Sequence, residues 1–415
     1  MEGSDTVDMT VFPAVPCIIT TRRESAFGTS ARRTCMLINN WYVAAVEDDV
    51  KVGKPYRVKM LGLWFALFRN KANEVVCVND TCSHRGGSLG LGKVNNGRIA
   101  CSYHGWEYNS RGRCTRIPAL GDEVKIPARA RVDCYPVVVR YGWIWVFLGD
   151  LPEEKRPPIP DNYPYYDEAM ASREKWGIVH LNYEVQCNWA RSEENSIDGA
   201  HPSFVHSSFG NKRDPKLMLV EPVAHEWGSS TYRERPPAEY RNLSRMTQSV
   251  LEEKRGNNKA LTWFSIVGIS HLIDIERSNG VRHVTFAART PIDADNTRIF
   301  SHQVRNFLTG PEHDEERLEG RKKAAAEDTV VSQNVNPRYL PRSMSGELLV
   351  ESDQNEAPFR KLIYKLAERG WEIDTDEAER QGRYNALAIP CPLRRENPKN
   401  WIAKPIPTTY PRRDD

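Results

Sequence analysis

The sequence has no long hydrophobic run and no excess of charge of one sign. No stretch approaches the roughly eighteen consecutive apolar residues that a membrane-spanning helix requires, although 40% of the residues are hydrophobic. Lys and Arg number 58 and Asp and Glu number 55, which gives a net charge of +3. We therefore expect no membrane span, and the charge indicates neither a nucleic-acid partner nor an anionic membrane surface.

Cysteine is scarce, and a glycine-rich dinucleotide-binding fingerprint is missing. The nine cysteines are an odd number and thinly scattered, which excludes a disulfide framework and favours a reducing cytoplasm. No G-x-G-x-x-G stretch stands between a strand-like run and a helical one. The chain therefore shows no Rossmann-type nicotinamide site.

What the sequence does have is two units that pair a cysteine with a histidine. Cys82-Ser-His84 is followed, after sixteen residues, by Cys101-Ser-Tyr-His104. A [2Fe–2S] cluster of the Rieske type takes two thiolates on one iron and two imidazoles on the other. Each unit mixes both ligand types, whereas the usual zinc spacings pair like with like. We interpret the four residues as Rieske ligands; a zinc site and unliganded core positions are the alternatives.

The length of the chain and the spacing of its strands and prolines predict two domains. A chain of 415 residues is long for a single core. Residues 37–155 contain short β-prone runs separated by turn residues, which predicts a small all-β domain around the Cys/His units. A dense run of prolines between Pro152 and Pro164 predicts the connection to the next domain.

Residues 156–415 predict a second domain of α+β type. Strand-like runs alternate with polar turns, as in an antiparallel sheet; they include residues 175–181, 260–267, 282–287 and 297–302. Residues 310–332 and 357–370 resemble helices. Residues 1–36 contain arginine, serine and threonine, as transit peptides do, but also acidic residues and no clean amphipathic repeat. We expect this segment to form a disordered extension.

A second pair of histidines lies in the larger domain, in Asp198-Gly-Ala-His201-Pro-Ser-Phe-Val-His206. A spacing of five is off the i,i+4 face of a regular helix, but a helix end or break at Gly199 or Pro202 could bring both histidines to one ion. Two histidines and one carboxylate on one octahedral face leave positions for O2 and substrate in non-heme Fe(II) sites. Two partly buried, hydrogen-bonded histidines are the alternative.

The two motifs in this order resemble the oxygenase α subunits of the Rieske non-heme iron ring-hydroxylating oxygenases, over roughly residues 37–370. The resemblance implies a Rieske domain followed by a helix-grip (START-like) catalytic domain, and a head-to-tail homotrimer. It also implies that Asp198 is not an iron ligand. Instead, Asp198 would hydrogen-bond His201 and, across a subunit interface, His104 of the next protomer, which would form the electron path.

The third iron ligand has two candidates. Asp328 follows a glutamate and precedes Gln333 and Pro337, an order that resembles the Glu-Asp…Gln…Pro signature of the monooxygenase and demethylase branch, in which that Asp binds iron. Asp353, followed by Gln354, opens the next predicted helix and would otherwise be its N-cap. We favour Asp328.

Residues outside the ligand sets have both a functional and an ordinary interpretation. Glu194 and Asn195 precede Asp198 and could reach the iron pocket, Asn195 as a catalytic residue beside Asp198; they could also be plain polar helix positions. Cys187 and Cys391 lie outside both motifs, and we interpret them as core cysteines.

The same resemblance implies a terminal oxygenase that depends on a partner. Electrons from NAD(P)H would come from a separate reductase, directly or through a ferredoxin, to the Rieske cluster. They would continue to Fe(II) at His201, His206 and Asp328, where O2 is activated. No further cysteine quartet indicates a plant-type ferredoxin within the chain.

The branch of the family implies monooxygenation of an aromatic or heterocyclic small molecule, by hydroxylation or by O- or N-demethylation. A mostly apolar pocket would suit a hydrophobic, ring-containing substrate. Arene cis-dihydroxylation is the alternative within the family, and an electron-transfer protein without oxygen chemistry is the alternative outside it.

Overall fold

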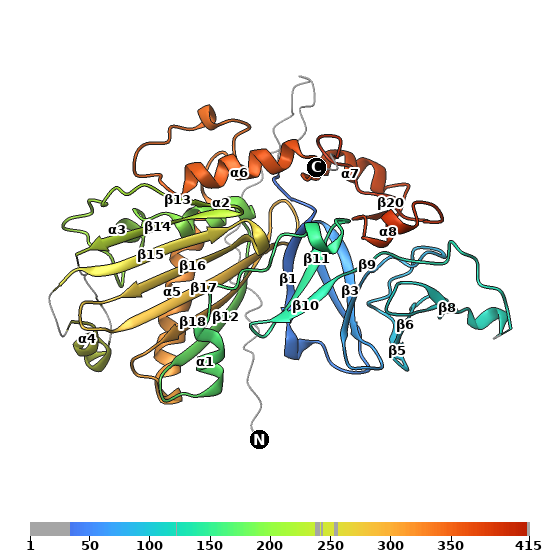
Figure 1. Ribbon diagram of the computed structural model, residues 1–415, viewed down its shortest axis with the longest axis horizontal. Coiled ribbons are helices and arrows are strands. Elements are labelled where there is room, and N and C mark those ends of the chain that lie inside the picture. Colours follow the sequence, from blue (N-terminus) through green and yellow to red (C-terminus); the bar gives the residue numbers. More distant parts are fainter. Residues whose placement is uncertain (1–33, 122, 237–240, 242–243, 253–255, 413–415) are drawn as a thin grey trace, which may run out of the picture.

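The computed structural model describes residues 34–121, 123–236, 241, 244–252 and 256–412 (Figure 1). Residues 1–33 of the predicted extension lie outside the described residues. Residues 34–36, which were predicted to belong to it, are instead at most 2% exposed. The Cys35 N–H donates to Glu372 Oε1 (3.0 Å), and the Ile373 N–H donates to the Met36 carbonyl (2.8 Å). These bonds to a distant part of the chain hold the segment in the core.

The N-terminal domain consists of three small antiparallel sheets, in the orders β1-β11-β10, β2-β3-β4-β9 and β5-β6-β7-β8. The apolar, β-prone strand Leu63–Arg69 is buried from Phe65 to Phe68 and pairs with a strand on each side. The prediction of an all-β domain is confirmed. Its strands are β1 Asn40–Val46, β2 Tyr56–Met60, β3 Leu63–Arg69, β4 Val75–Asn79, β5 Lys93–Asn95, β6 Arg98–Ala100, β7 Glu107–Tyr108, β8 Cys114–Arg116, β9 Cys134–Tyr135, β10 Val137–Arg140 and β11 Trp143–Leu148.

The second domain is built on a seven-stranded antiparallel sheet in the order β12-β18-β17-β16-β15-β14-β13. The prediction of an α+β domain with an antiparallel sheet is confirmed. Three strands, β13, β14 and β16, were not predicted; β14 is rich in polar and charged residues, and two of its arginines, Arg233 and Arg235, line a cavity. The strands are β12 Gly177–Val185, β13 Val223–His225, β14 Gly228–Arg235, β15 Asn258–Ser265, β16 Ser270–Glu276, β17 Arg282–Pro291 and β18 Thr297–Arg305.

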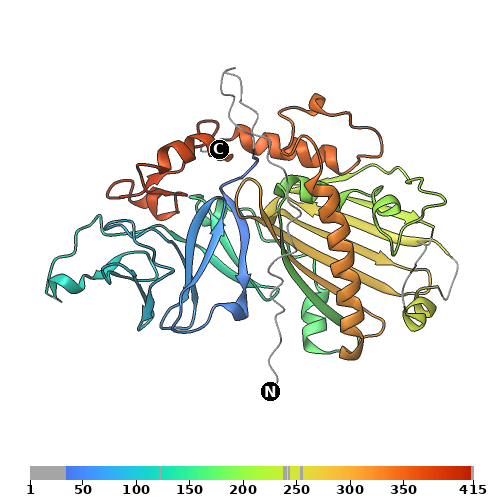
Figure 2. The ribbon, with the colours of Figure 1, turned by 180° about the vertical axis from the view of Figure 1, so that it is seen from behind.

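Two long helices pack against this sheet, close to where the sequence predicts them. The predicted helix 310–332 is α5, and the predicted helix 357–370 is α6. Figure 2 shows α5 lying across one face of the sheet. None of the helices in the described part of the chain is long and apolar enough to cross a bilayer. The helices are α1 Tyr165–Ala171, α2 Trp189–Ile197, α3 Pro202–Val205, α4 Arg245–Glu252, α5 Asp314–Gln333, α6 Glu356–Glu368, α7 Thr375–Gly382 and α8 Leu393–Glu396.

The two faces of the large sheet have different roles. Along β17, Val284 and Phe286 point into a core that is shared with the N-terminal domain, where Phe286 stacks on Trp143 with ring centroids 5.8 Å apart. Because side chains alternate along a strand, Thr285 and Arg289 point to the other face, beneath α5, where a cavity lies. The sheet thus joins the two domains on one side and forms a site on the other.

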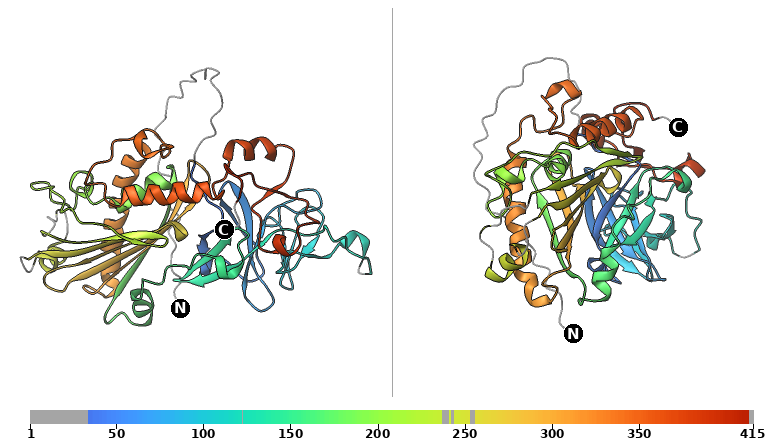
Figure 3. Two further views of the ribbon diagram at one scale, coloured as in Figure 1. Left: turned by 45° about the horizontal axis from the view of Figure 1, so that its top comes forward. Right: turned by 60° about the vertical axis from the view of Figure 1, so that its left-hand side comes forward.

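Residues 387–405, with the short parallel strands β19 Leu387–Ala388 and β20 Lys404–Pro405, fold back onto the N-terminal domain (Figure 3). The Tyr135 hydroxyl donates to the Ile389 carbonyl (2.7 Å), and Arg394 forms a bidentate ion pair with the buried Asp133 (2.6 and 2.7 Å). This segment was predicted to belong to the second domain, but these contacts place it against the first.

Candidate metal centres

Two similar loops bring the Cys/His units together at one end of the N-terminal domain. In the first loop, the Gly86 N–H donates to the Cys82 carbonyl (3.0 Å), and in the second the Gly105 N–H donates to the Cys101 carbonyl (3.0 Å). The loops follow β4 and β6, so the sheets fix their bases. The repeated turn presents one cysteine and one histidine from each loop.

The four side chains form a compact set with sulfur inside and imidazole outside. Cys82 and Cys101 are 3% and 5% exposed, whereas His84 is exposed and His104 is partly buried. The two imidazole rings lie 4.6 Å apart between centroids. The His84 ring also stacks on Trp106 (4.5 Å), which fixes its orientation.

The sulfur atoms lie in a space that tolerates no extra side chain. The pKa of Cys101 falls to about 6, chiefly because the neighbouring Cys82 thiol donates a hydrogen bond to its sulfur. A Cβ atom on Gly87 would lie 2.8 Å from Cys101 Sγ. Tyr108 Oη lies 3.0 Å from Cys82 Sγ and can donate to it. Two adjacent thiolates and two nearby imidazoles are the donor set that a Rieske cluster requires.

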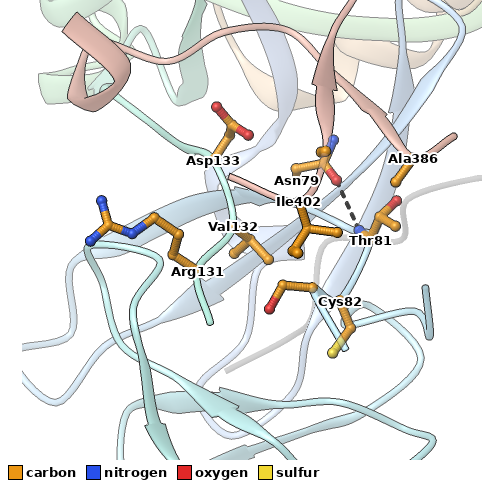
Figure 4. A pocket seen from close by; sticks show the side chains of 10 residues that line it. Asn79, Thr81, Cys82, Arg131, Val132, Asp133, Ala386 and Ile402 are labelled. Atoms are coloured by element: carbon orange, nitrogen blue, oxygen red, sulfur yellow. Dashed lines mark hydrogen bonds between the residues drawn. The ribbon is translucent and has the colours of Figure 1, made fainter. Parts of the chain in front are cut away.

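The back of the first loop is covered by the segment that returns from the second domain. Figure 4 shows Ala386 and Ile402 facing Thr81 and the backbone of Cys82, with the cysteine sulfur directed away from them. The space between these residues is about 10 Å³, which is roughly the size of one water molecule. Any group bound by Cys82 must therefore lie on the opposite side of the loop.

The second histidine pair flanks a one-turn helix. Helix α2 ends at Ile197, and the Asp198 carboxylate accepts the backbone N–H groups of Ala200 (2.7 Å) and His201 (3.1 Å), which turns the chain. Helix α3 then starts at Pro202, and His206 follows its last residue. The break expected near Gly199 or Pro202 is present.

His201 and His206 converge with Asp328 of α5. Asp328 Oδ1 lies 3.4 Å from His201 Nε2 and 3.5 Å from His206 Nε2, and the three ligand atoms all lie within 4.8 Å of one another. Two imidazole nitrogens and one carboxylate oxygen at this spacing could hold a single divalent ion. The donor set therefore fits a mononuclear iron.

Each residue of this trio has a polar neighbour: Asn195 contacts the Asp328 oxygen that faces the histidines, and carboxylates lie beside the outer nitrogens of the two histidines. Asn195 Nδ2 donates to Asp328 Oδ1 (2.9 Å). Glu327 Oε2 lies 3.1 Å from His206 Nδ1, and Asp198 Oδ2 lies 3.4 Å from His201 Nδ1. Outer partners of this kind fix the tautomer and orientation of metal-binding imidazoles.

The centre concentrates negative charge. The pKa values of Asp198, Glu327 and Asp328 all lie below their usual range: burial acts to raise them, but hydrogen bonds and nearby histidines outweigh it. Burial acts to lower the pKa of His201, but the two aspartates raise it to about 9. Three ionised carboxylates around two imidazoles favour a bound cation.

Other predicted residues lie away from this trio. Asp353 Oδ2 accepts the Val350 N–H (2.6 Å) and does not join the cluster, and the N-cap of α6 is Asn355. Glu194 forms a buried ion pair with Arg360 (2.5 Å), so it does not face the histidines. Cys187 and Cys391 are 5% and 0% exposed, respectively, and stand apart from the Cys/His loops.

Some residues of the two centres were not predicted. The sequence indicates Trp106 only as part of the turn beside the second pair and of the following hairpin, and Tyr108 only as part of that hairpin, although an aromatic residue two or four positions after the second histidine is a signal that could have been used. Glu327 appeared only within the signature before Asp328. No local pattern indicated its contact with His206, because 120 residues separate the two in the sequence.

A cavity of about 1620 Å³ opens beside His201, His206 and Asp328. One wall is the face of the large sheet that points away from the shared core, and the opposite wall is α5. Isoleucines of β16 and β18 supply apolar surface, as expected, but several arginines also line the cavity. Figure 1 shows α3 at one end of the molecule and the loops beside β5 and β6 at the other.

Comparisons with known proteins match both parts of the chain. Residues 40–136 match the Rieske [2Fe-2S] domain, and residues 185–369 match the vanillate O-demethylase oxygenase C-terminal domain. The chain is 31% identical over 191 residues to a 4beta-methylsterol monooxygenase of Methylococcus capsulatus, which covers 46% of the chain and 48% of that protein. It is 30% identical over 167 residues to a 3-chlorobenzoate-3,4-dioxygenase oxygenase subunit of Comamonas testosteroni (40% of the chain, 37% of that protein). The match thus spans half or less of these curated relatives.

Solved structures share the fold over most of the chain. Dicamba monooxygenase bound to dicamba superimposes with a TM-score of 0.65 at 23% identity, over 82% of this chain and 98% of that structure. At this identity, the similarity extends to the architecture alone.

Proposed function

The chain belongs to the Rieske oxygenases, and from that premise we propose that it is a terminal oxygenase that monooxygenates a small organic molecule. The observation that carries the proposal is the convergence of His201, His206 and Asp328 at the wall of a large cavity, in a chain that also presents the paired Cys/His loops. When bound, a Rieske cluster supplies single electrons and a mononuclear Fe(II) activates O2 beside the substrate.

The two groups would be held by the residues that the loops and α5 bring together. The cluster would be held by Cys82, His84, Cys101 and His104. The iron would be held by His201, His206 and Asp328. Glu327 accepts the Nδ1 proton of His206, which leaves Nε2 with its lone pair directed toward the centre. Asn195 donates to the Asp328 oxygen that faces the histidines and so limits rotation of the carboxylate.

Electron transfer between neighbouring subunits is the second part of the proposal. Within one chain, the Cys/His loops and α3 lie at opposite ends of the molecule (Figure 1). Asp198 lies beside His201 and its side chain is 26% exposed, so it could reach the His104 imidazole of a neighbouring protomer. A head-to-tail contact must close by rotation, and the homotrimer implied by the family is such a ring.

The electrons would come from a separate NAD(P)H-dependent reductase, directly or through a ferredoxin. The exposed His84 ring at the loop surface is a point that such a partner could approach. No disulfide joins the described cysteines to one another, and a reducing cytoplasm suits such a protein.

The reaction we favour is hydroxylation or O- or N-demethylation of an aromatic or heterocyclic compound. Its support is the match to the C-terminal domain named for vanillate O-demethylase, together with the monooxygenase relative. Because a dioxygenase subunit is also similar to the chain, arene cis-dihydroxylation is the second candidate.

Isotope labelling separates these two reactions. The holoenzyme, supplied with NADH and a generic reductase, would be given ¹⁸O2 and a panel of methoxy-, N-methyl- and unsubstituted arenes. We expect one labelled oxygen in the product, or formaldehyde release from the methylated probes. A diol carrying two labelled atoms would support the dioxygenase, and a protein that binds about two irons and oxidises no probe would contradict an oxygenase role.

A further inference from the structure

The helix that carries Asp328 also carries arginines on the same face. Arg321 and Arg317 precede Asp328 by seven and eleven residues, which are two and three helical turns, so the three side chains share one face of α5. All three line the cavity. At about 1.5 Å per residue, Arg321 lies about 10 Å along the helix axis from Asp328.

Arg321 has only neutral hydrogen-bond partners in the described structure. Its guanidinium donates to Ser301 Oγ (2.7 Å) and to Thr285 Oγ1 (3.4 Å), hydroxyls of the sheet wall. Burial lowers the pKa of Arg321, as expected for a cation withdrawn from water. The residue is partly exposed, and a guanidinium largely withdrawn from water is costly unless an anion compensates it.

The acidic side chains near Arg321 are engaged elsewhere. Glu316 accepts from Ser244 (3.0 Å), and Glu319 pairs with Lys322 (2.8 Å). Asp328 accepts from Asn195 and faces the two histidines. Among the other cavity arginines, Arg289 is neutralised by an ion pair with the buried Glu193. Arg321 therefore forms no ion pair with an acidic side chain of the described residues and relies on two hydroxyls.

A second polar group faces the same part of the cavity. His283 of β17 lies two residues before Thr285 on the same face of the strand, and its Nδ1 is buried with no hydrogen-bond partner among the described groups. Arg317, which donates to Gln303 (3.1 Å), adds positive charge there. The cavity thus has an acidic end at the histidine pair and a basic end around Arg321.

We propose that the substrate is an organic acid whose carboxylate or sulfonate binds Arg321, with the hydroxyls of Ser301 and Thr285 and the His283 Nδ1 as further partners. This inference rests on the proposed function, because the opposite end of the molecule must reach the centre at Asp328. An acid group about two helical turns from the reacting carbon would bind the basic end of the cavity and so orient the reacting carbon toward the histidine pair. A neutral ring would lack this orienting interaction.

Binding to the holoenzyme tests this assignment without turnover. Calorimetry would compare 4-methoxycinnamate and 4-methoxybenzenesulfonate with their uncharged amides, since each acid and its amide have nearly the same shape. We expect each acid to bind at least about tenfold more tightly than its amide, which is the usual size of a charge-assisted interaction. Equal affinity of acids and amides for the wild-type protein would overturn the proposal.

Variants locate the interaction. Arg321→Gln is expected to abolish the preference for the acid while leaving amide binding within about threefold, and Arg321→Lys to keep part of it. Lys361→Gln removes an equal charge from an exposed position of α6 that does not line the cavity, and should leave the preference intact. An equal loss of both ligands in Arg321→Gln, with Arg321→Lys no better, would mean that Arg321 only supports packing.

Turnover then separates this inference from the proposed function. An acid that binds through Arg321 but is never oxygenated would contradict the proposed function and leave the anion site standing. Oxygenation of the neutral amides, without any preference for the acids, would support the proposed function and contradict the anion site.

Discussion

The Asn195 side-chain amide donates a 2.9 Å hydrogen bond to the carboxylate of Asp328 and so ties the end of α2 to α5. Replacing Asn195 with Ala removes the donor and lets the carboxylate rotate, so the affinity for Fe(II) should fall about tenfold or more. Metal analysis after dialysis against graded chelator would measure this loss. Asn334→Ala, which removes a hydrogen bond at the exposed end of the same helix, is the matched control.

The identity of the third iron ligand can be tested by a direct competition. Asp328→Ala should lower the iron content by about one atom per chain while the absorption of the [2Fe–2S] cluster is unchanged, because the two centres lie at opposite ends of the chain. Asp353→Ala, whose side chain only accepts a backbone N–H in its own loop, should leave all iron in place. The opposite pattern would transfer the role to Asp353.

Transfer between subunits predicts complementation. Chains with Cys101→Ala lack the cluster, and chains with His201→Ala lack the iron, so each should be inactive alone. Co-expressed with distinct tags and purified as mixed oligomers, they should recover substantial activity, since an intact cluster of one chain can then face the intact iron of its neighbour. Mixed oligomers without activity would place the transfer within single chains.

The space around the cluster sulfurs predicts a strict requirement for glycine at position 87. Gly87→Ala would place a Cβ 2.8 Å from Cys101 Sγ and 2.9 Å from Tyr103 Cβ, so the second loop must shift. We expect a marked loss of cluster absorbance and EPR signal per chain. Gly320→Ala, on α5 with no atom within 4 Å of the new Cβ and no left-handed φ, should keep both signals, and full cluster content in Gly87→Ala would show that the loops adapt.

A buried carboxyl predicts a pH dependence of stability. Burial, and then the charge of Asp198, raises the pKa of Glu356 to about 8. The folded protein therefore holds this proton at pH values where the unfolded chain has released it, and stability falls as pH rises from the ordinary glutamate value to about 8. Glu356→Gln should remove this loss, so its advantage over the wild type should grow by about 1.4 kcal/mol per pH unit in that window. Urea unfolding at pH 5, 7 and 9 would measure it; a constant difference would contradict the raised pKa.

The Cys/His loops could be predicted from the sequence because both ligands of each loop are local. Cys82 and His84 share one turn, and so do Cys101 and His104, so spacing alone indicates the donor set. The alternation of apolar residues likewise predicts β17 and β18. In contrast, β14 could not be predicted in this way, because its face toward the cavity is polar and the strand has no alternation of apolar residues.

The remaining features depend on contacts that no local pattern encodes. Asp328 reaches the histidines only because α5 crosses the sheet, and it was predicted from a family signature rather than from its own neighbourhood. The same crossing sets Arg321 against Ser301 and Thr285, a pairing of three distant segments. The return of residues 387–405 to the first domain also carries no signal in composition or spacing.

The packing of residues 387–405 against the first domain affects when the iron–sulfur site can mature during synthesis. During synthesis, N-terminal domains generally fold first, but here Asp133 and Tyr135 receive Arg394 and Ile389, which leave the ribosome some 250 residues later. The rear of the first ligand loop thus stays uncovered until residues 387–405 have emerged. Maturation of the iron–sulfur site is therefore expected to follow translation, and a ribosome-bound chain that stops before residue 387 should be a poor acceptor of the cluster.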